Sequence, residues 1–107
     1  MVTRIQSIHF DADLKLISLI EEKIARLAHY VQDMAIEARV ILKLEHVGKI
    51  QDKIIEVIIN LPGQPMVVKS TRKSFEEALS DVMATLKKQL TRYKERIQEK
   101  HKDSFKQ

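Results

Sequence analysis

The sequence predicts one α+β domain, a two-layer sandwich in which a four-stranded mixed sheet carries both helices on one face, in the order β-α-β-β-β-α. Three observations predict this fold. Two segments place apolar residues at three- and four-residue steps, as amphipathic helices do, and the other segments alternate apolar and polar residues, as half-buried strands do. The two prolines lie together in one turn. At 107 residues, of which 44% are hydrophobic, the chain has the size and composition of a single domain.

The first third of the chain predicts a strand followed by a helix. Val2 to Phe10 alternates loosely and predicts the strand. Asp11 or Asp13 can then cap the helix, which is predicted from Leu14 to about Tyr30. The apolar residues of this helix keep helical spacing: Leu16, Ile17, Ile20, Ile24, Leu27 and Ala28.

Three further alternating strands are predicted in the middle of the chain: Ile36 to Glu45, Asp52 to Asn60 and about Met66 to Ser70. Residues 46–51, which contain Gly48, are expected to connect the first two of these, and Pro62-Gly63 predicts a type II turn before the third. The first two strands of the chain are joined through a helix, so they are predicted to run parallel. The short later connections predict an antiparallel meander.

The last helix is predicted from Ser74 to about Lys102, and Ser74 with Glu77 matches a capping box at its start. Its apolar residues form one continuous stripe that is expected to pack on the sheet: Phe75, Ala78, Leu79, Val82, Met83, Leu86, Leu90, Tyr93 and Ile97.

Charge is divided along this last helix. The second half carries net +5, because two carboxylates (Glu95 and Glu99) face seven cations: Lys87, Lys88, Arg92, Lys94, Arg96, Lys100 and Lys102. Cations complement the helix dipole only in the last turn, and these begin well before it. Lys23 and Arg26 of the first helix are expected to flank the same groove. Such a surface suits phosphates, to which lysine and arginine donate hydrogen bonds; a merely solvated charged face is the alternative.

The composition argues against an enzyme, a metal protein and a membrane protein. There is no cysteine, the two glycines leave no phosphate-cradling nucleotide loop, and the four histidines lack metal-ligand spacing, so neither a metal nor another cofactor is expected. A net charge of +4 and a pI near 9.4 favour an anionic partner. No stretch is apolar enough to span a bilayer, and a cytoplasmic location is expected.

Four motifs, in order, resemble the bacterial ribosome hibernation-promoting factor family across about residues 2 to 100: Glu22 to Leu27, Val40 to Glu45, Ser74 to Leu79 and Leu86 to Arg96. The resemblance implies a domain similar to double-stranded RNA-binding domains that sits in the decoding channel of the small ribosomal subunit. There it would contact ribosomal RNA, block messenger and transfer RNA, and keep ribosomes dormant in stress or stationary phase. The RNA-facing positions of the family fall on Lys23, Arg26, Lys88, Arg92, Lys94 and Arg96.

The chain departs from the family pattern at three positions. Ala84 and Thr85 replace an Asp-Lys pair of many relatives, so one RNA contact is expected to be absent or to move to Lys87, and His46 stands where a lysine is common. Residues 1–102 are expected to form one ribosome-binding domain and residues 103–107 a short tail, as in short-form members without the C-terminal dimerisation domain. Whether such a form pairs ribosomes or only silences them stays open.

Two other functions stay open on the residues alone. A general double-stranded RNA-binding domain would use the same strand meander and last helix. A protein-interaction or membrane-surface module would use the basic amphipathic helix, although the sheet needs the apolar face of that helix. The expected partners are therefore the small ribosomal subunit and its RNA, with no membrane and no small-molecule substrate, and the protein is expected to be a monomer off the ribosome.

Overall fold

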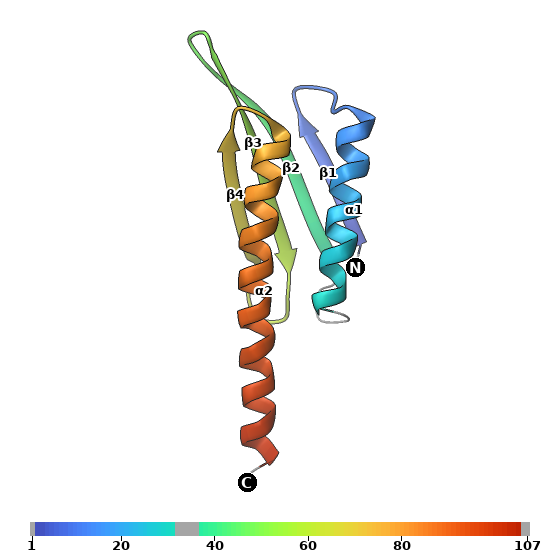
Figure 1. Cartoon of the computed structure of the whole chain (residues 1–107), viewed down its shortest axis with the longest axis vertical. Coiled ribbons are helices and arrows are strands. Elements are labelled where there is room, and N and C mark those ends of the chain that lie inside the picture. Colours follow the sequence, from blue (N-terminus) through green and yellow to red (C-terminus); the bar gives the residue numbers. More distant parts are fainter. Residues whose placement is uncertain (1, 32–36, 106–107) are drawn as a thin grey trace.

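The computed structural model describes residues 2–31 and 37–105. The elements in chain order are β1 (Val2–Ile8), α1 (Leu14–Val31), β2 (Glu37–Val47), β3 (Ile50–Asn60), β4 (Met66–Arg72) and α2 (Phe75–Phe105) (Figure 1). This order confirms the β-α-β-β-β-α prediction. Ile36, predicted to begin the second strand, lies outside the described residues, as do residues 106–107 of the expected tail, while residues 103–105 continue α2.

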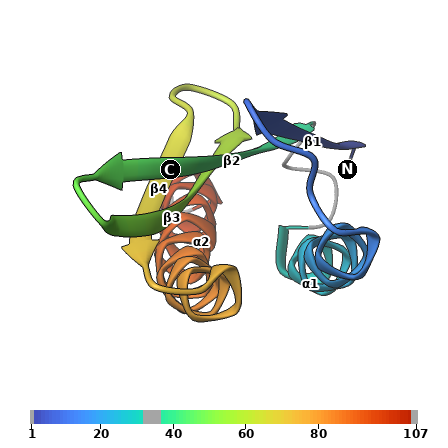
Figure 2. The ribbon, with the colours of Figure 1, turned by 90° about the horizontal axis from the view of Figure 1, so that it is seen from above.

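The four strands form one mixed sheet in the order β1-β2-β3-β4. β1 and β2 run parallel, whereas β2 with β3 and β3 with β4 pair antiparallel, as the lengths of the connections predicted. Seen from above, both helices lie on the same side of the sheet (Figure 2). The cations of α1 and α2 are therefore all carried by one layer of the molecule.

The hydrophobic core lies between this helix layer and the sheet. Both helices and the strands β2, β3 and β4 contribute buried side chains, and Ile5 of β1 packs against them partly buried. The largest fully buried side chains are Ile20, Ile24, Val40, Leu42, Ile55, Val57, Ile59, Leu79, Val82, Leu86 and Leu90. Burying one large aliphatic side chain is worth about 1.5–3 kcal/mol. Packing of these residues therefore fixes both helices against the sheet and sets which helix faces remain outside.

Both helices begin at side-chain caps. At the start of α1 the backbone N–H of Lys15 donates to Asp13 Oδ1 at 3.1 Å. The sequence allowed either Asp11 or Asp13 as the cap, and in the structure it is Asp13. At the start of α2 the N–H of Glu77 donates to Ser74 Oγ at 3.2 Å, the first half of the capping box. The Glu77 carboxylate lies 3.9 Å from Arg72 Nε, so it faces β4.

The first strand is shorter than predicted. β1 ends at Ile8, and His9 has a positive φ of 64°, which turns the chain out of the sheet. Phe10, predicted as the last strand residue, instead stacks on Phe75 with ring centroids 5.5 Å apart. This aromatic pair ties the β1–α1 connection to the start of α2.

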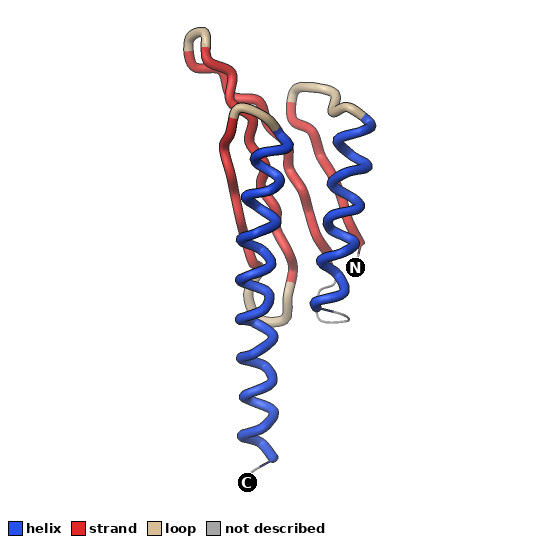
Figure 3. The backbone as a smooth tube through the Cα atoms, viewed as in Figure 1, coloured by secondary structure: helices blue, strands red, loops and turns tan. Residues whose placement is uncertain are grey.

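The hairpin of β2 and β3 is longer than predicted. Residues 46–51 were expected to be a connection, but pairing continues to Val47 opposite Ile50, and only Gly48 and Lys49 form the turn. Gly48 has φ 62°, a value that glycine adopts without strain and that tight hairpin turns need. β1 and β4 pair no further than Lys43 and Lys53, so the hairpin projects beyond its neighbours (Figure 3).

α2 also projects, at the opposite end of the molecule. The helix continues well past the end of the sheet (Figure 1), and the molecule measures 61 × 24 × 19 Å along its principal axes. Tyr93 marks the place where support from the sheet ends, since its hydroxyl donates to the carbonyl oxygen of Pro62 in the β3–β4 connection at 3.1 Å. Gly63, beside it, has φ 98°, as the predicted type II turn requires.

Candidate nucleic-acid interface

The candidate surface consists of the seven cations that the sequence marked on the two helices. Lys23 and Arg26 come from the second half of α1, and the other five come from α2 between Leu86 and Ile97. Five are exposed, and Lys23 and Lys94 are half-buried: the exposed ones are Arg26, Lys87, Lys88, Arg92 and Arg96. The ion pairs and clefts around α2 show which way each of them faces.

One side of α2 faces α1. Leu19 and Lys23 of α1 line a cleft with Glu76, Ser80 and Met83 among the residues of α2. Residues four, seven or eleven positions apart lie on the same side of a helix. Lys87 and Lys94 follow Met83 by four and eleven residues, so they continue the side that lines this cleft. We call Lys23, Lys87 and Lys94 the cleft flank.

The other side of α2 faces β4. Asp81 accepts hydrogen bonds from Ser70 Oγ at 3.0 Å and from Arg72 Nη1 at 2.8 Å, both on β4. Lys88 and Arg92 follow Asp81 by seven and eleven residues and so lie on this side. Arg96 lies one turn beyond Arg92. We call Lys88, Arg92 and Arg96 the strand flank.

Between the two flanks, Thr91 and Glu95 lie on the outer surface of α2, which we call the crest. A shallow depression of about 380 Å³ on this crest is lined by α2 alone: Lys87, Lys88, Thr91, Arg92 and Glu95. Thr91 Oγ1 donates to the carbonyl oxygen of Lys87 at 2.7 Å, which ties up this hydroxyl within the helix. Glu95 places the one carboxylate of this depression next to the cations.

From the sequence we expected all these cations to flank a single groove, whereas the structure separates them into two groups on different sides of α2. Lys23 lies beside Glu76 and Ser80, in the first, acidic half of α2, whereas Lys88 and Arg92 lie on the side of α2 that faces β4. The reason is helical geometry. An α-helix has 3.6 residues per turn, so cations at positions 87, 88, 92 and 94 cannot all lie on one side of it.

Most of these cations form no ion pair in the part of the chain that the structure describes. Within it, no carboxylate lies within 4.0 Å of Lys23, Lys88, Arg92, Lys94 or Arg96, whereas Arg26 donates to Glu22 Oε1 at 2.7 Å. The cations nearer the sheet are paired: Arg72 with Asp81, and Lys73 with Asp52. The positive charge of α2 is therefore available to an external anion at the end that leaves the sheet.

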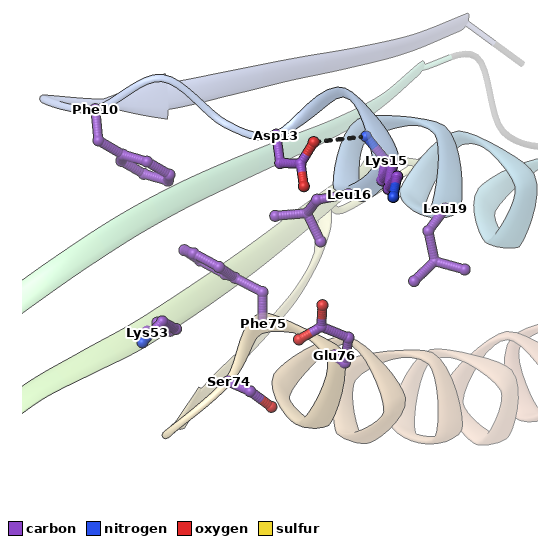
Figure 4. A pocket seen from close by; sticks show the side chains of 9 residues that line it. All are labelled: Phe10, Asp13, Lys15, Leu16, Leu19, Lys53, Ser74, Phe75 and Glu76. Carbon is purple, nitrogen blue, oxygen red and sulfur yellow. Dashed lines mark hydrogen bonds between the residues drawn. The ribbon is translucent and has the colours of Figure 1, made fainter.

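A separate pocket of about 400 Å³ lies at the other end of the helix pair, where α1 and α2 begin (Figure 4). Its walls are largely apolar, from Phe10, Leu16, Leu19 and Phe75. Its rim carries both signs of charge: Asp13, Lys15, Lys53 and Glu76. None of the seven candidate cations lines it. Lys15, which was not among those candidates, is the one α1 cation there. It lies eight residues before Lys23, so the helical spacing of these two lysines could have pointed to it.

The described part of the chain contains neither a cluster of metal-ligating side chains nor a membrane-spanning helix. There, no three His, Cys, Asp or Glu side chains come together in a way that could hold a metal ion. No described helix is long and apolar enough to cross a membrane.

Residues 3–98 match the family model described as sigma 54 modulation protein / S30EA ribosomal protein. The chain belongs to this family. The family is ribosome-associated and is not a known enzyme family. The match covers both helices up to the end of the candidate cations, so membership confirms the resemblance seen in the four sequence motifs.

Two solved structures share the fold. A ribosomal subunit interface protein from Coxiella burnetii is 23% identical with a TM-score of 0.73, covering 88% of this chain and 98% of its own. The N-terminal domain of Protein Y from Thermus thermophilus is 26% identical with a TM-score of 0.72, covering 87% of this chain and 99% of its own. No curated protein matches the sequence.

Proposed function

We propose that this protein silences translation by binding the small ribosomal subunit in its decoding channel, where it blocks messenger and transfer RNA and stabilises dormant ribosomes during stress or stationary phase. The supporting observation is the row of cations on the half of α2 that leaves the sheet, most of which form no described ion pair, in a chain that belongs to a ribosome-associated family. The proposed RNA-binding residues are Lys23, Arg26, Lys87, Lys88, Arg92, Lys94 and Arg96.

The proposed binding is electrostatic and independent of base sequence. Lysine and arginine side chains neutralise phosphates and release their counterions, which supplies affinity without reading bases. An α-helix with its side chains is about 10–12 Å across, so a helix held in the decoding channel would occupy the space that messenger and transfer RNA need. Binding and inhibition would then be one event, and no catalytic step is required.

The family departures fall on exposed positions. Thr85 lies on the strand flank, four residues after Asp81, and Lys88 follows it by three residues on the same side. A phosphate that a lysine at position 85 would bind can therefore be bound by Lys88 as readily as by Lys87. His46 is exposed and pairs with Gln51 next to the turn of the β2–β3 hairpin, which projects at the end of the molecule opposite the C-terminal end of α2 (Figure 3). We propose that the protein is cytoplasmic, like its ribosomal partner, and monomeric when free.

The test is co-sedimentation with purified small subunits. Lys88→Glu with Arg92→Glu should abolish co-sedimentation and lower the free energy of unfolding by less than about 1 kcal/mol, because neither side chain has a described acidic partner. Arg39→Glu with Lys49→Glu is the matched control: it makes the same change in net charge at exposed residues away from the helices. Retained binding by the α2 variant would remove those residues from the site.

A competition experiment separates this function from general recognition of RNA duplexes. A general double-stranded RNA-binding domain reads the shape of any A-form helix. Competition of subunit binding by an unrelated RNA duplex, long enough to cover the site and supplied at equal phosphate concentration, would favour that second function. A duplex that fails to compete would support a site built for the subunit.

A further inference from the structure

The basic half of α2 carries its cations on both sides and a carboxylate between them. Lys94, Glu95 and Arg96 are consecutive, and consecutive residues of an α-helix point about 100° apart. Lys94 therefore lies on the cleft flank, Arg96 on the strand flank, and Glu95 on the crest between them. Lys87 and Arg92 repeat the same division one to two turns earlier, with Thr91 on the crest.

A single phosphate backbone along the crest does not fit this arrangement. In the depression it would meet Lys87, Lys88 and Arg92, but it would also pass over Thr91 and Glu95, which offer one hydroxyl already bonded within the helix and one negative charge. It would also leave Lys94 and Arg96 pointing away from it on either side. Since like charges repel at short range, Glu95 makes the crest less suitable than either flank for an RNA strand.

Each flank, in contrast, can hold a strand of its own. The strand flank offers Lys88, Arg92 and Arg96 in consecutive turns, and none of the three has a carboxylate within 4.0 Å among the described residues. The cleft flank offers Lys94 on the basic half, and Lys23 of α1 lies further back along the same side, beside the first, acidic half of α2. Beyond Tyr93 the sheet no longer lies under the helix (Figure 1), and there Arg96 of the strand flank is exposed while Lys94 of the cleft flank is half-buried.

We propose that the basic half of α2 lies between two separate RNA backbones, holding one on each flank, and so bridges two segments of folded RNA. This inference rests on the proposed function, since it specifies how the same cations bind RNA. The partner it requires is a folded RNA that brings two phosphate backbones to within one helix diameter of each other, about 10–12 Å. A single strand or one face of an isolated duplex would engage only one flank.

Directed RNA cleavage from each flank tests the proposal. The chain has no cysteine, so Ser80→Cys and Thr85→Cys each create a single attachment site for an iron chelate that generates hydroxyl radicals. Both residues are exposed and uncharged; Ser80 lines the cleft with α1, and Thr85 lies on the strand flank. Each labelled protein is bound to small subunits, and the cysteine-free protein treated with the same reagent is the control.

We expect the two positions to cleave two different segments of ribosomal RNA that are distant in sequence. Cleavage of the same nucleotides from both positions, or cleavage from one position only, would overturn the two-backbone arrangement while leaving ribosome binding intact. Failure of the cysteine-free protein to co-sediment with small subunits would overturn the proposed function itself. The two failures are therefore distinguishable in one experiment.

Discussion

Neutralising Lys88 and Arg92 should reduce the salt dependence of small-subunit binding by a calculable amount. Five of the proposed contacts have no acidic partner among the described residues: Lys23, Lys88, Arg92, Lys94 and Arg96. With about 0.7–0.9 counterions released per phosphate contact, these five give a slope of log affinity against log salt of about −3.5 to −4.5. Affinity should then fall about 100- to 500-fold between 50 and 200 mM salt.

Lys88→Gln with Arg92→Gln removes two of the five contacts, so the slope should rise to about −2.1 to −2.7. The assay is equilibrium binding of fluorescently labelled protein to small subunits at several salt concentrations, with Arg39→Gln and Lys49→Gln as the matched control. An unchanged slope for the α2 variant would place these two side chains away from phosphates. An equal reduction in the control would mean that overall net charge, and not the position of the cations, governs binding.

Substitutions at three further positions test how the fold holds α2. Leu86→Ala should lower the free energy of unfolding in urea by about 2–5 kcal/mol, because this side chain is fully buried; a decrease below about 1 kcal/mol would contradict its place in the core. Ser74→Ala should cost about 0.5–2 kcal/mol because the helix cap is removed, and Ser74→Asp should restore most of it. Tyr93→Phe should cost no more than about 1.5 kcal/mol overall but speed amide hydrogen exchange after residue 93, and unchanged exchange there would show that the Pro62 contact does not anchor the helix.

The sequence was sufficient to predict elements whose signals are local. The stripe of α2 and the cap at Ser74 depend on residues within a few positions of one another, and both agree with the structure. The length of the β2–β3 hairpin was missed because Gly48 suggested a loop, while the polar residues around it weaken the alternation. The early end of β1 was missed because nothing in the sequence signals the positive φ of His9.

The direction in which each flank of α2 faces depends on a long-range contact. The spacing of Asp81, Lys88 and Arg92 already puts these three on one side of a helix. Which way that side faces depends on Ser70 and Arg72, which come from β4 and bind Asp81 only in the folded chain. Periodicity could therefore identify the cations but could not assign them to a groove.

The residues that hold α2 in place and those proposed to bind RNA are nearly separate along the helix. Buried side chains run from Phe75 to Leu90, and beyond Tyr93 the apolar stripe continues with Ile97, which is already 36% exposed. The cations of the strand flank are spaced at four residues, and like charges at that spacing weaken a helix by about 0.2–0.5 kcal/mol per pair. The free protein thus carries an electrostatic cost in the segment least supported by the sheet. Neutralisation by phosphates would remove that cost, so this charge arrangement is better explained by binding than by stability.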